Sequence, residues 1–276
     1  MRVHRGAPLL AALAVIVSCG GHGAATSTTT SAPTSSLAHV ALGVPAQQWH
    51  ATVIATLAHD PVLFTEGLEL DANVRYESSG LYGSSVVRAI DQSTGATLHT
   101  FTLPSSMFAE GITRVDDRLL VLTWKEHTAF VLDAATMSEV NQLTYASDGW
   151  GMCTLGSDVV TSDGTDTLTF RDPNTLAARR TTRVHLGEAP IANINELECV
   201  NGIVYANVWQ TDRVVRIDPI SGAVSAFIDM PELRPPSTLN DPDAVLNGIA
   251  HDAATDTFLI TGKRWPVMYR VTFAAS

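Results

Sequence analysis

The chain has 276 residues and a formal net charge of −11, with 17 basic residues scattered along its length. No stripe of basic side chains is present to neutralise successive phosphates, which disfavours nucleic acid as a partner. Hydrophobic residues make up 45% and charged residues 16%, with 19 glycines and 13 prolines. This composition argues against a disordered main body and favours many short strands joined by tight turns over long helices.

The N-terminus resembles an export signal with a lipid attachment site. Arg2 and Arg5 precede an apolar run from Leu9 to Val17, which is too short to span a bilayer as a mature helix. The run ends in Ile16-Val-Ser-Cys, which resembles a bacterial lipobox, so we expect Cys19 to carry the lipid and to become the first mature residue. A diacylglycerol and a further acyl chain supply the two anchors that stable membrane attachment needs.

The residues that follow, as far as Ser36, are dominated by Gly, Ala, Ser and Thr and have too few large apolar groups to fold. We therefore expect a signal peptide at 1–18, a lipid-anchored flexible linker at 19–48 and a folded catalytic domain at 49–276. That domain is expected outside the cytoplasm, tethered to the cell membrane as a lipoprotein.

A turn that begins with aspartate recurs about every 40 residues, close to the length of one four-stranded propeller blade. Aspartate favours such turns because its carboxylate bonds the backbone two residues on. Alternating apolar runs of strand length lie between the turns, and none has a sustained helical period. The four turns are Asp91-Gln-Ser-Thr-Gly, Asp133-Ala-Ala-Thr, Asp172-Pro-Asn-Thr and Asp218-Pro-Ile-Ser-Gly.

A fifth copy begins near Val245 and runs to Phe273, but the chain stops before its fourth strand. Residues His50 to Leu57 alternate suitably and have no blade before them, so we expect them to pair with the last blade. The sequence thus predicts an all-β fold, a five-bladed β-propeller whose ring is closed by an N-terminal strand. The stretch from Met230 to Ala244 carries four prolines and predicts a long loop, either a functional cover or an insertion between blades.

Two sets of residues mark equivalent places in the repeats. The first set is found by counting back nine positions from the aspartate of each turn, or from Thr272 in the fifth copy. The second set lies 13 to 16 residues before the first, at the start of each innermost strand. Structural repetition favours similar residues, so the unlike residues found here indicate a ligand site at one end of the axis, unless the tryptophans simply pack between blades. The sets are Tyr82, Trp124, Asp163, Trp209 and Lys263, and Glu66, Glu110, Trp150, Asn195 and Asn247.

Nine short motifs over residues 60 to 273 together resemble the glutaminyl-peptide cyclotransferases of the plant and bacterial type. Each motif is weak alone, and their joint order and spacing make the resemblance specific. The motifs are Phe64-Thr-Glu-Gly-Leu, Glu77-Ser-Ser-Gly-Leu-Tyr-Gly, Phe108-Ala-Glu-Gly-Ile, Gly149-Trp-Gly-Met, Ser162-Asp-Gly, Asn195-Glu-Leu-Glu, Ala206-Asn-Val-Trp, Leu246-Asn-Gly-Ile-Ala and Thr261-Gly-Lys-Arg-Trp-Pro.

The resemblance implies a five-bladed propeller that converts the N-terminal glutamine of peptides or proteins into pyroglutamate with loss of ammonia. It implies no cofactor and no metal, and we expect a monomer. Glu66 departs from the family pattern, in which a glutamine is expected, and places an extra carboxylate near the substrate amide. The residues that the resemblance implicates are Phe64, Glu110, Trp124, Trp150, Asn195, Trp209 and Lys263.

Cyclisation requires a group that takes a proton from the α-amine and delivers one to the departing nitrogen. Glu110 is predicted to do both, because surrounding tryptophans disfavour its charged form and raise its pKa toward neutrality. Lys263 and Asn195 are candidates to hydrogen-bond the carboxamide oxygen as it gains negative charge, or Lys263 neutralises a glutamate. The expected substrate-binding residues are Phe64, Glu66, Trp124, Trp150 and Trp209.

Two other functions stay open at this point. Propellers also act as calcium-dependent lactonases, for which oxygen ligands are available from Glu66, Glu110, Asp163, Asn195 and Asn247. An exported propeller that binds a peptide or glycan without catalysis is the second alternative. The nine histidines lack zinc-hydrolase spacing, and the chain has no Gly-x-Ser-x-Gly elbow.

Cys153 and Cys199 occupy matching places in successive blades. Inner strands of adjacent blades lie close together, and disulfides persist outside the cytoplasm. The two residues therefore form either a disulfide or a pair of buried free thiols.

Overall fold

The computed structural model describes residues 46–276, so Cys19 and the predicted signal peptide lie outside the described residues. This part of the chain is almost entirely β-structure. Its helical turns are two short 3₁₀ segments, η1 (Pro231–Leu233) and η2 (Pro236–Thr238), in the long loop that the prolines predict. No helix among residues 46–276 is both long and apolar enough to cross a bilayer.

The first twelve strands after β1 form three four-stranded antiparallel sheets, which we call the first, second and third units. The first unit is β2 (Thr65–Asp71), β3 (Val74–Ser79), β4 (Val86–Asp91) and β5 (Thr97–Thr102). The second is β6 (Ala109–Val115), β7 (Arg118–Thr123), β8 (Thr128–Asp133) and β9 (Glu139–Thr144). The third is β10 (Met152–Leu155), β11 (Asp158–Thr161), β12 (Thr167–Arg171) and β13 (Ala178–Arg183).

The remaining long strands form one eight-stranded sheet that contains the fourth and fifth units. The fourth unit is β16 (Ile194–Val200), β17 (Ile203–Val208), β18 (Arg213–Ile217) and β19 (Val224–Asp229). The fifth is β20 (Leu246–Asp252), β21 (Thr257–Gly262), β22 (Val267–Ala275) and, as its outermost strand, β1 (Gln47–Ala58). A small hairpin, β14 (His185–Leu186) with β15 (Ala189–Pro190), precedes the fourth unit.

The N-terminal strand joins two units. β1 pairs antiparallel with β22, from Trp49 opposite Ala275 to Ala58 opposite Val267, and its first residues pair parallel with β19. Gln47 and Gln48 belong to this strand, so strand structure among the described residues includes two residues N-terminal to position 49. The reason is the parallel pairing with β19, which extends β1 beyond the segment that alternation alone indicates.

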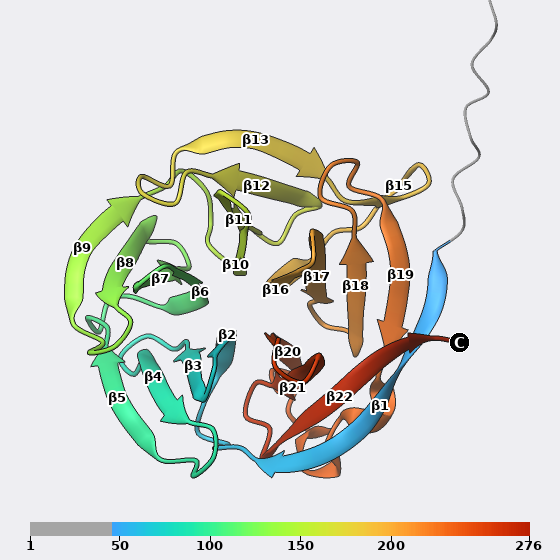
Figure 1. Cartoon of the computed structure of the whole chain (residues 1–276), viewed down its shortest axis with the longest axis horizontal. Coiled ribbons are helices and arrows are strands. Elements are labelled where there is room, and N and C mark those ends of the chain that lie inside the picture. Colours follow the sequence, from blue (N-terminus) through green and yellow to red (C-terminus); the bar gives the residue numbers. More distant parts are fainter. Residues whose placement is uncertain (1–45) are drawn as a thin grey trace, which may run out of the picture. The chain divides into compact units, whose positions relative to one another are not determined.

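The units are arranged around a central axis, with β2, β6, β10, β16 and β20 innermost (Figure 1). The hydrophobic core is divided into clusters that lie between neighbouring units. The cluster between the fifth and first units is the smallest, with buried members Leu68, Ala250, Leu259 and Met268. The junction between the fifth and first units therefore has fewer buried apolar residues than the other four.

The four predicted aspartate turns are present at the expected places. The carboxylate of Asp91 accepts a hydrogen bond from the backbone of Thr94, and that of Asp133 accepts one from the backbone of Thr136. Asp172 and Asp218 accept equivalent backbone hydrogen bonds in the third and fourth units. Each turn is thus stabilised within a few residues, as the repeated sequence pattern indicates.

Candidate active site

A cavity of about 280 Å³ lies at the end of the axis where the innermost strands begin. It receives one or more residues from every unit. Each of the eight residues predicted to be catalytic or substrate-binding lines it. The lining residues are Phe64, Glu66, Leu81, Phe108, Glu110, Trp124, Trp150, Asn195, Trp209, Asp243 and Lys263.

The strand pattern explains why these residues converge. Glu66, Glu110 and Asn195 lie at the second position of β2, β6 and β16, and the start of each inner strand points to the same end of the axis. Trp124 and Lys263 directly follow β7 and β21, the second strands of their units, which run back to that end. One end of the axis therefore collects residues that lie about 200 positions apart in the sequence.

The polar centre of the cavity is formed by two carboxyl groups and one ammonium. Lys263 Nζ lies 2.7 Å from Glu66 Oε1, and Asn247 Nδ2 donates to Glu66 Oε2 at 3.3 Å. Glu66 is 1% exposed, while Glu110 and Lys263 are each 6% exposed. The charged pair is thus almost completely removed from water.

Burial raises the pKa of Glu110 well above its ordinary value, and the negative charge of Glu66 adds to the rise, while Lys263 opposes it. Burial also raises the pKa of Glu66, against the attraction of Lys263. Because these two carboxyl groups face each other, their ionisation is coupled. Glu110 therefore keeps its proton to higher pH than an ordinary glutamate does.

Aromatic rings enclose the polar centre. Trp150 and Trp209 meet edge to face with their centroids 5.6 Å apart, and Phe108 packs against Trp124 at the same distance. Phe64 lies below the ammonium of Lys263, which is 4.5 Å from the ring centroid. These walls suit an uncharged side chain with an apolar stem.

Two buried polar atoms of the cavity lining have no partner within residues 46–276. They are Trp150 Nε1, a donor, and Asn195 Oδ1, an acceptor. A buried donor or acceptor without a hydrogen-bond partner costs free energy, and a ligand that hydrogen-bonds to both atoms removes this cost. A primary carboxamide offers the complementary pair, a carbonyl oxygen and an NH₂ group.

Hydrogen bonds between units fix the backbone beneath these side chains. Ser78 Oγ, on β3, donates to the carbonyl of Glu110 in the next unit at 2.6 Å. Ser162 Oγ does the same for the carbonyl of Asn195, also at 2.6 Å. Glu110 and Asn195 therefore lie on backbone that is hydrogen-bonded to the preceding unit.

One of the equivalent positions predicted from the sequence is wrong. Tyr82 is 51% exposed, and its hydroxyl donates to Glu126 outside the cavity. The residue that corresponds to Trp124 and Lys263 is Gly80, whose N–H donates to the carbonyl of Phe64 as Trp124 N–H does to that of Phe108. Counting back nine fails because the first unit has two extra residues after this point.

Two further members of the predicted sets lie outside the cavity lining. Asp163 turns away, and its carboxylate accepts hydrogen bonds from the backbone and hydroxyl of Thr165. Asn247 is fully buried beneath the cavity, where Nδ2 also donates to the carbonyl of Thr65. Within residues 46–276, no group of three or more His, Cys, Asp or Glu side chains is placed to hold a metal ion.

The sequence reasoning missed three lining residues, Phe108, Leu81 and Asp243. Phe108 precedes Glu110 by two residues as Phe64 precedes Glu66, so this repeat was a usable signal. A Cβ at Gly80 would lie 2.0 Å from the Phe108 ring, which occupies the place of a side chain there. Asp243 comes from the long loop, and no periodicity indicates where a loop residue will lie.

The disulfide alternative holds for the two cysteines. Cys153 and Cys199 are bonded, with their Cα atoms 5.5 Å apart, and join the inner strands of the third and fourth units. Asn195 lies in one of these strands, and Trp150 lies two residues before the start of the other. The cross-link therefore holds the neighbours that supply the unpaired donor and acceptor.

Comparison with known proteins gives a consistent result. The model of the glutamine cyclotransferase family matches residues 23–273. A glutaminyl-peptide cyclotransferase from Arabidopsis thaliana is 36% identical over 223 residues, covering 79% of this chain and 70% of the plant protein. The crystal structure of Myxococcus xanthus glutaminyl cyclase is similar with a TM-score of 0.78 and 32% identity, over 84% of this chain and 99% of that one. The chain therefore belongs to the glutamine cyclotransferase family.

Proposed function

We propose that the protein is a glutaminyl-peptide cyclotransferase, which converts the N-terminal glutamine of peptides or proteins into pyroglutamate and releases ammonia. The observation that carries the proposal is a buried carboxyl group, Glu110, in an indole-walled cavity with an open donor and acceptor. The family match and the two relatives favour this function over a non-catalytic binding module or a metal-dependent lactonase.

Glu110 is the proposed general acid and base. As a carboxylate it accepts a proton from the α-amine while the amine nitrogen forms a bond to the side-chain carboxamide carbon. The carboxyl group then gives that proton to the carboxamide nitrogen, and the carbon–nitrogen bond breaks to release ammonia. The raised pKa of Glu110 makes its carboxylate a stronger base toward the α-amine than an ordinary glutamate is, and the carboxyl group that results is the acid for the departing nitrogen.

Lys263, Trp150 and Asn195 are the proposed partners of the carboxamide. The Trp150 Nε1–H and the Lys263 ammonium are donors for the carboxamide oxygen, which gains negative charge as the ring closes. The open Asn195 Oδ1 accepts from the NH₂ group and so distinguishes glutamine from glutamate. Phe64, Trp124 and Trp209 hold the apolar stem in a folded-back conformer, and Glu66 keeps Lys263 in place.

The finer architecture and setting also belong to this proposal. We interpret the five units as the blades of a five-bladed propeller, closed by β1 as the outer strand of the last blade. The protein is expected to be a monomeric lipoprotein outside the cytoplasm, anchored through Cys19. The proposed chemistry uses only protein side chains, so turnover is expected to survive dialysis against a chelator, and its loss would favour the metal-dependent alternative.

The test is ammonia release from a Gln-Phe dipeptide by wild-type protein and by Glu110→Gln. The variant is expected to lose turnover by at least about 10²-fold, the lower range for removal of a general acid and base, with its fold intact by circular dichroism. Glu198→Gln is the matched control, because Glu198 is another carboxyl group whose pKa burial raises well above normal but which lies outside the cavity lining. Near-normal turnover by Glu110→Gln would remove Glu110 from the mechanism. If the wild-type protein binds the dipeptide but releases no ammonia, that result would favour the non-catalytic binding module.

A further inference from the structure

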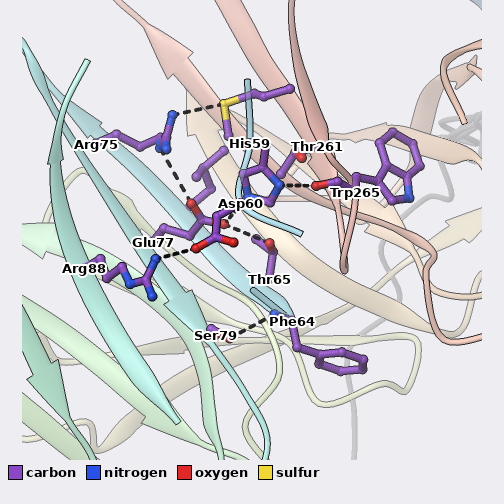
Figure 2. A network of polar contacts seen from close by, with 12 residues as sticks. His59, Asp60, Phe64, Thr65, Arg75, Glu77, Ser79, Arg88, Thr261 and Trp265 are labelled. Carbon is purple, nitrogen blue, oxygen red and sulfur yellow. Dashed lines mark hydrogen bonds and ion pairs between the residues drawn. The ribbon is translucent and has the colours of Figure 1, made fainter. Parts of the chain in front are cut away.

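A buried polar network of His59, Arg75 and Glu77 lies between the fifth and first units (Figure 2). None of these three residues lines the cavity. His59 Nδ1 lies 2.6 Å from the carbonyl oxygen of Trp265, and Nε2 lies 2.7 Å from Glu77 Oε1. The side chains of His59 and Glu77 are completely buried. Arg75 approaches from the other side, with Nε 3.6 Å from Glu77 Oε2.

The charge state of the network follows from its partners. A carbonyl oxygen only accepts, so Nδ1 of His59 carries a hydrogen. Burial, the largest single influence, works to lower the pKa of His59, but the negative charge of Glu77 and the hydrogen bonds to Glu77 and to the Trp265 carbonyl together outweigh it, and the pKa is raised. Burial likewise works to raise the pKa of Glu77, and His59 and Arg75 outweigh it, so the pKa is lowered. His59 is therefore an imidazolium that donates from both ring nitrogens, and Glu77 is a carboxylate.

The other units have no charge at the equivalent place. We call the residues at the start of the innermost strands the rim residues. In each unit, the residue two positions after the rim residue has a cross-strand partner on the second strand. The rim residues are Glu66, Glu110, Trp150, Asn195 and Asn247. In the first unit that partner is Glu77, opposite Leu68. In the other units it is uncharged: Val121, Thr161, Ala206 and Ile260. Only this junction, where apolar packing is smallest, carries an ion pair at this position among the described units.

The network has one contact beside each member of the Glu66–Lys263 pair. Thr65, which directly precedes Glu66, donates its hydroxyl to Glu77 Oε1 at 2.8 Å. Trp265, whose carbonyl accepts from His59, lies two residues after Lys263 in a turn closed by the Trp265 N–H and the Gly262 carbonyl. A chain of contacts thus runs from the turn that carries Lys263, through His59 and Glu77, to the residue before Glu66.

We propose that His59 and Glu77 are positioning residues that hold Glu66 and Lys263 at bonding distance across the junction where the ring closes. The inference rests on the proposed cyclotransferase function only for its effect on turnover. Neither residue lines the cavity, so each acts through the backbone of β2 and of the 262–265 turn. A displacement of about 1 Å in a reacting group is enough to slow turnover by roughly 10²-fold.

Thr65→Val is the sharpest variant, because it removes the hydroxyl that contacts Glu77 and keeps the shape of the side chain. Thr65→Ser restores the hydroxyl. His59→Phe keeps a ring and removes both hydrogen bonds, and His251→Phe is its matched control, because His251 pairs with Asp256 away from the cavity. We expect Thr65→Val and His59→Phe to lower kcat for Gln-Phe roughly 10- to 100-fold with little change in KM, while Thr65→Ser and His251→Phe stay near wild type.

The second readout does not require activity. The chain has two lysines, Lys125 and Lys263, so protein labelled with ¹³C at lysine Cε gives two signals by nuclear magnetic resonance. We expect Thr65→Val and His59→Phe to shift the Lys263 signal and leave that of exposed Lys125 in place. Thr65→Ser and His251→Phe should leave both unchanged.

The proposal is overturned if Thr65→Val lowers only the melting temperature, with kcat per folded molecule and the Lys263 signal as in wild type. That result would make the network purely structural. If His59→Phe fails to fold, Thr65→Val alone decides. If wild-type protein releases no ammonia from any N-terminal glutamine peptide, the proposed function fails, while the Lys263 signal still tests the positioning role.

Discussion

The aspartate turns, which recur in the first four units, and the rim of the cavity, to which all five contribute, follow opposite rules. At the turns, Asp91, Asp133, Asp172 and Asp218 repeat one residue and one hydrogen-bonding pattern. At the rim, equivalent positions carry glutamate, tryptophan or asparagine, and four of the five, Glu66, Glu110, Trp150 and Asn195, line one cavity. Repetition in this chain therefore reports the fold, and departures from repetition report the site.

The comparison predicts a division of effects. A substitution at the rim is expected to change turnover more than stability, because each rim residue makes contacts that no other unit duplicates. A substitution at a turn is expected to change stability slightly and turnover not at all. The predictions below test this division, starting with the largest expected effect.

Replacing Lys263 by methionine removes the ammonium that lies 2.7 Å from Glu66. We expect kcat/KM for Gln-Phe to fall by roughly 10²- to 10³-fold, as for loss of one preorganised donor to a developing negative charge. Lys125→Met is the matched control, because Lys125 is the other lysine. It is exposed, and its Nζ lies 4.1 Å from the centroid of the Trp124 ring. Equal losses in the two variants would mean that rim charge, rather than Lys263, matters for turnover.

Gly164→Ala should displace one wall of the cavity. A Cβ at this position would lie 2.6 Å from Trp150 Cζ2, and the residue has a φ of +79°. Gly83→Ala has the same type of backbone cost, with φ at +84°, but its Cβ would meet nothing within 4 Å. We expect Gly164→Ala to raise KM about tenfold, which corresponds to about 1.4 kcal/mol, and Gly83→Ala to leave KM unchanged. Equal KM values would contradict the role of Trp150.

Glu66→Gln should move the pH dependence of turnover. The Glu66 charge raises the pKa of Glu110, and the variant removes that charge while Lys263 remains. Glu110 then loses its proton at lower pH, so the inflection of kcat/KM that belongs to Glu110 should shift to lower pH. The measurement is kcat/KM for Gln-Phe over roughly pH 4 to 9, a range that begins near the ordinary pKa of glutamate and extends above neutral pH. A profile that stays in place would show that the two carboxyl groups titrate independently.

Asp218→Ala is expected to have the smallest effect. The variant removes hydrogen bonds to the backbone of Ile220 and Ser221 in an exposed turn, so the free energy of unfolding should fall by no more than about 1 kcal/mol. Turnover per folded molecule should equal that of wild type. A loss of turnover here would break the division between turns and rim.

Much of this fold was predictable because its signals are local and repeated. The aspartate turns and the alternation around β7, β8, β17 and β18 give strands at the right places. The site was predictable to the extent that it inherits that period, and Glu110, Trp124 and Lys263 all lie at fixed distances from a strand end. Phe108 was within reach of the same reasoning, since it repeats the position of Phe64.

The remaining parts depend on irregular local lengths or on contacts between distant segments. The two extra residues after Gly80 shift Tyr82 out of its expected place, and only the hydrogen-bonding register shows this. Asp243 lies on a loop with no period. Glu77 sits inside a recognised motif, but its partner His59 precedes the first inner strand, and nothing in the local sequence pairs them.

The pairing of β1 with β22 has a consequence for the order of folding. The two strands lie far apart in the sequence, at Gln47–Ala58 and Val267–Ala275, so the fifth unit is completed only after β22 has been synthesised. Closing so long a loop is slow, because its entropy cost precedes any gain from the contacts. A chain that is cut short before β22 keeps exposed strand edges on both sides of the gap, and such edges promote aggregation. The pairing of β22 with β1 therefore decides whether the newly made protein completes its fifth unit or remains an aggregation-prone intermediate.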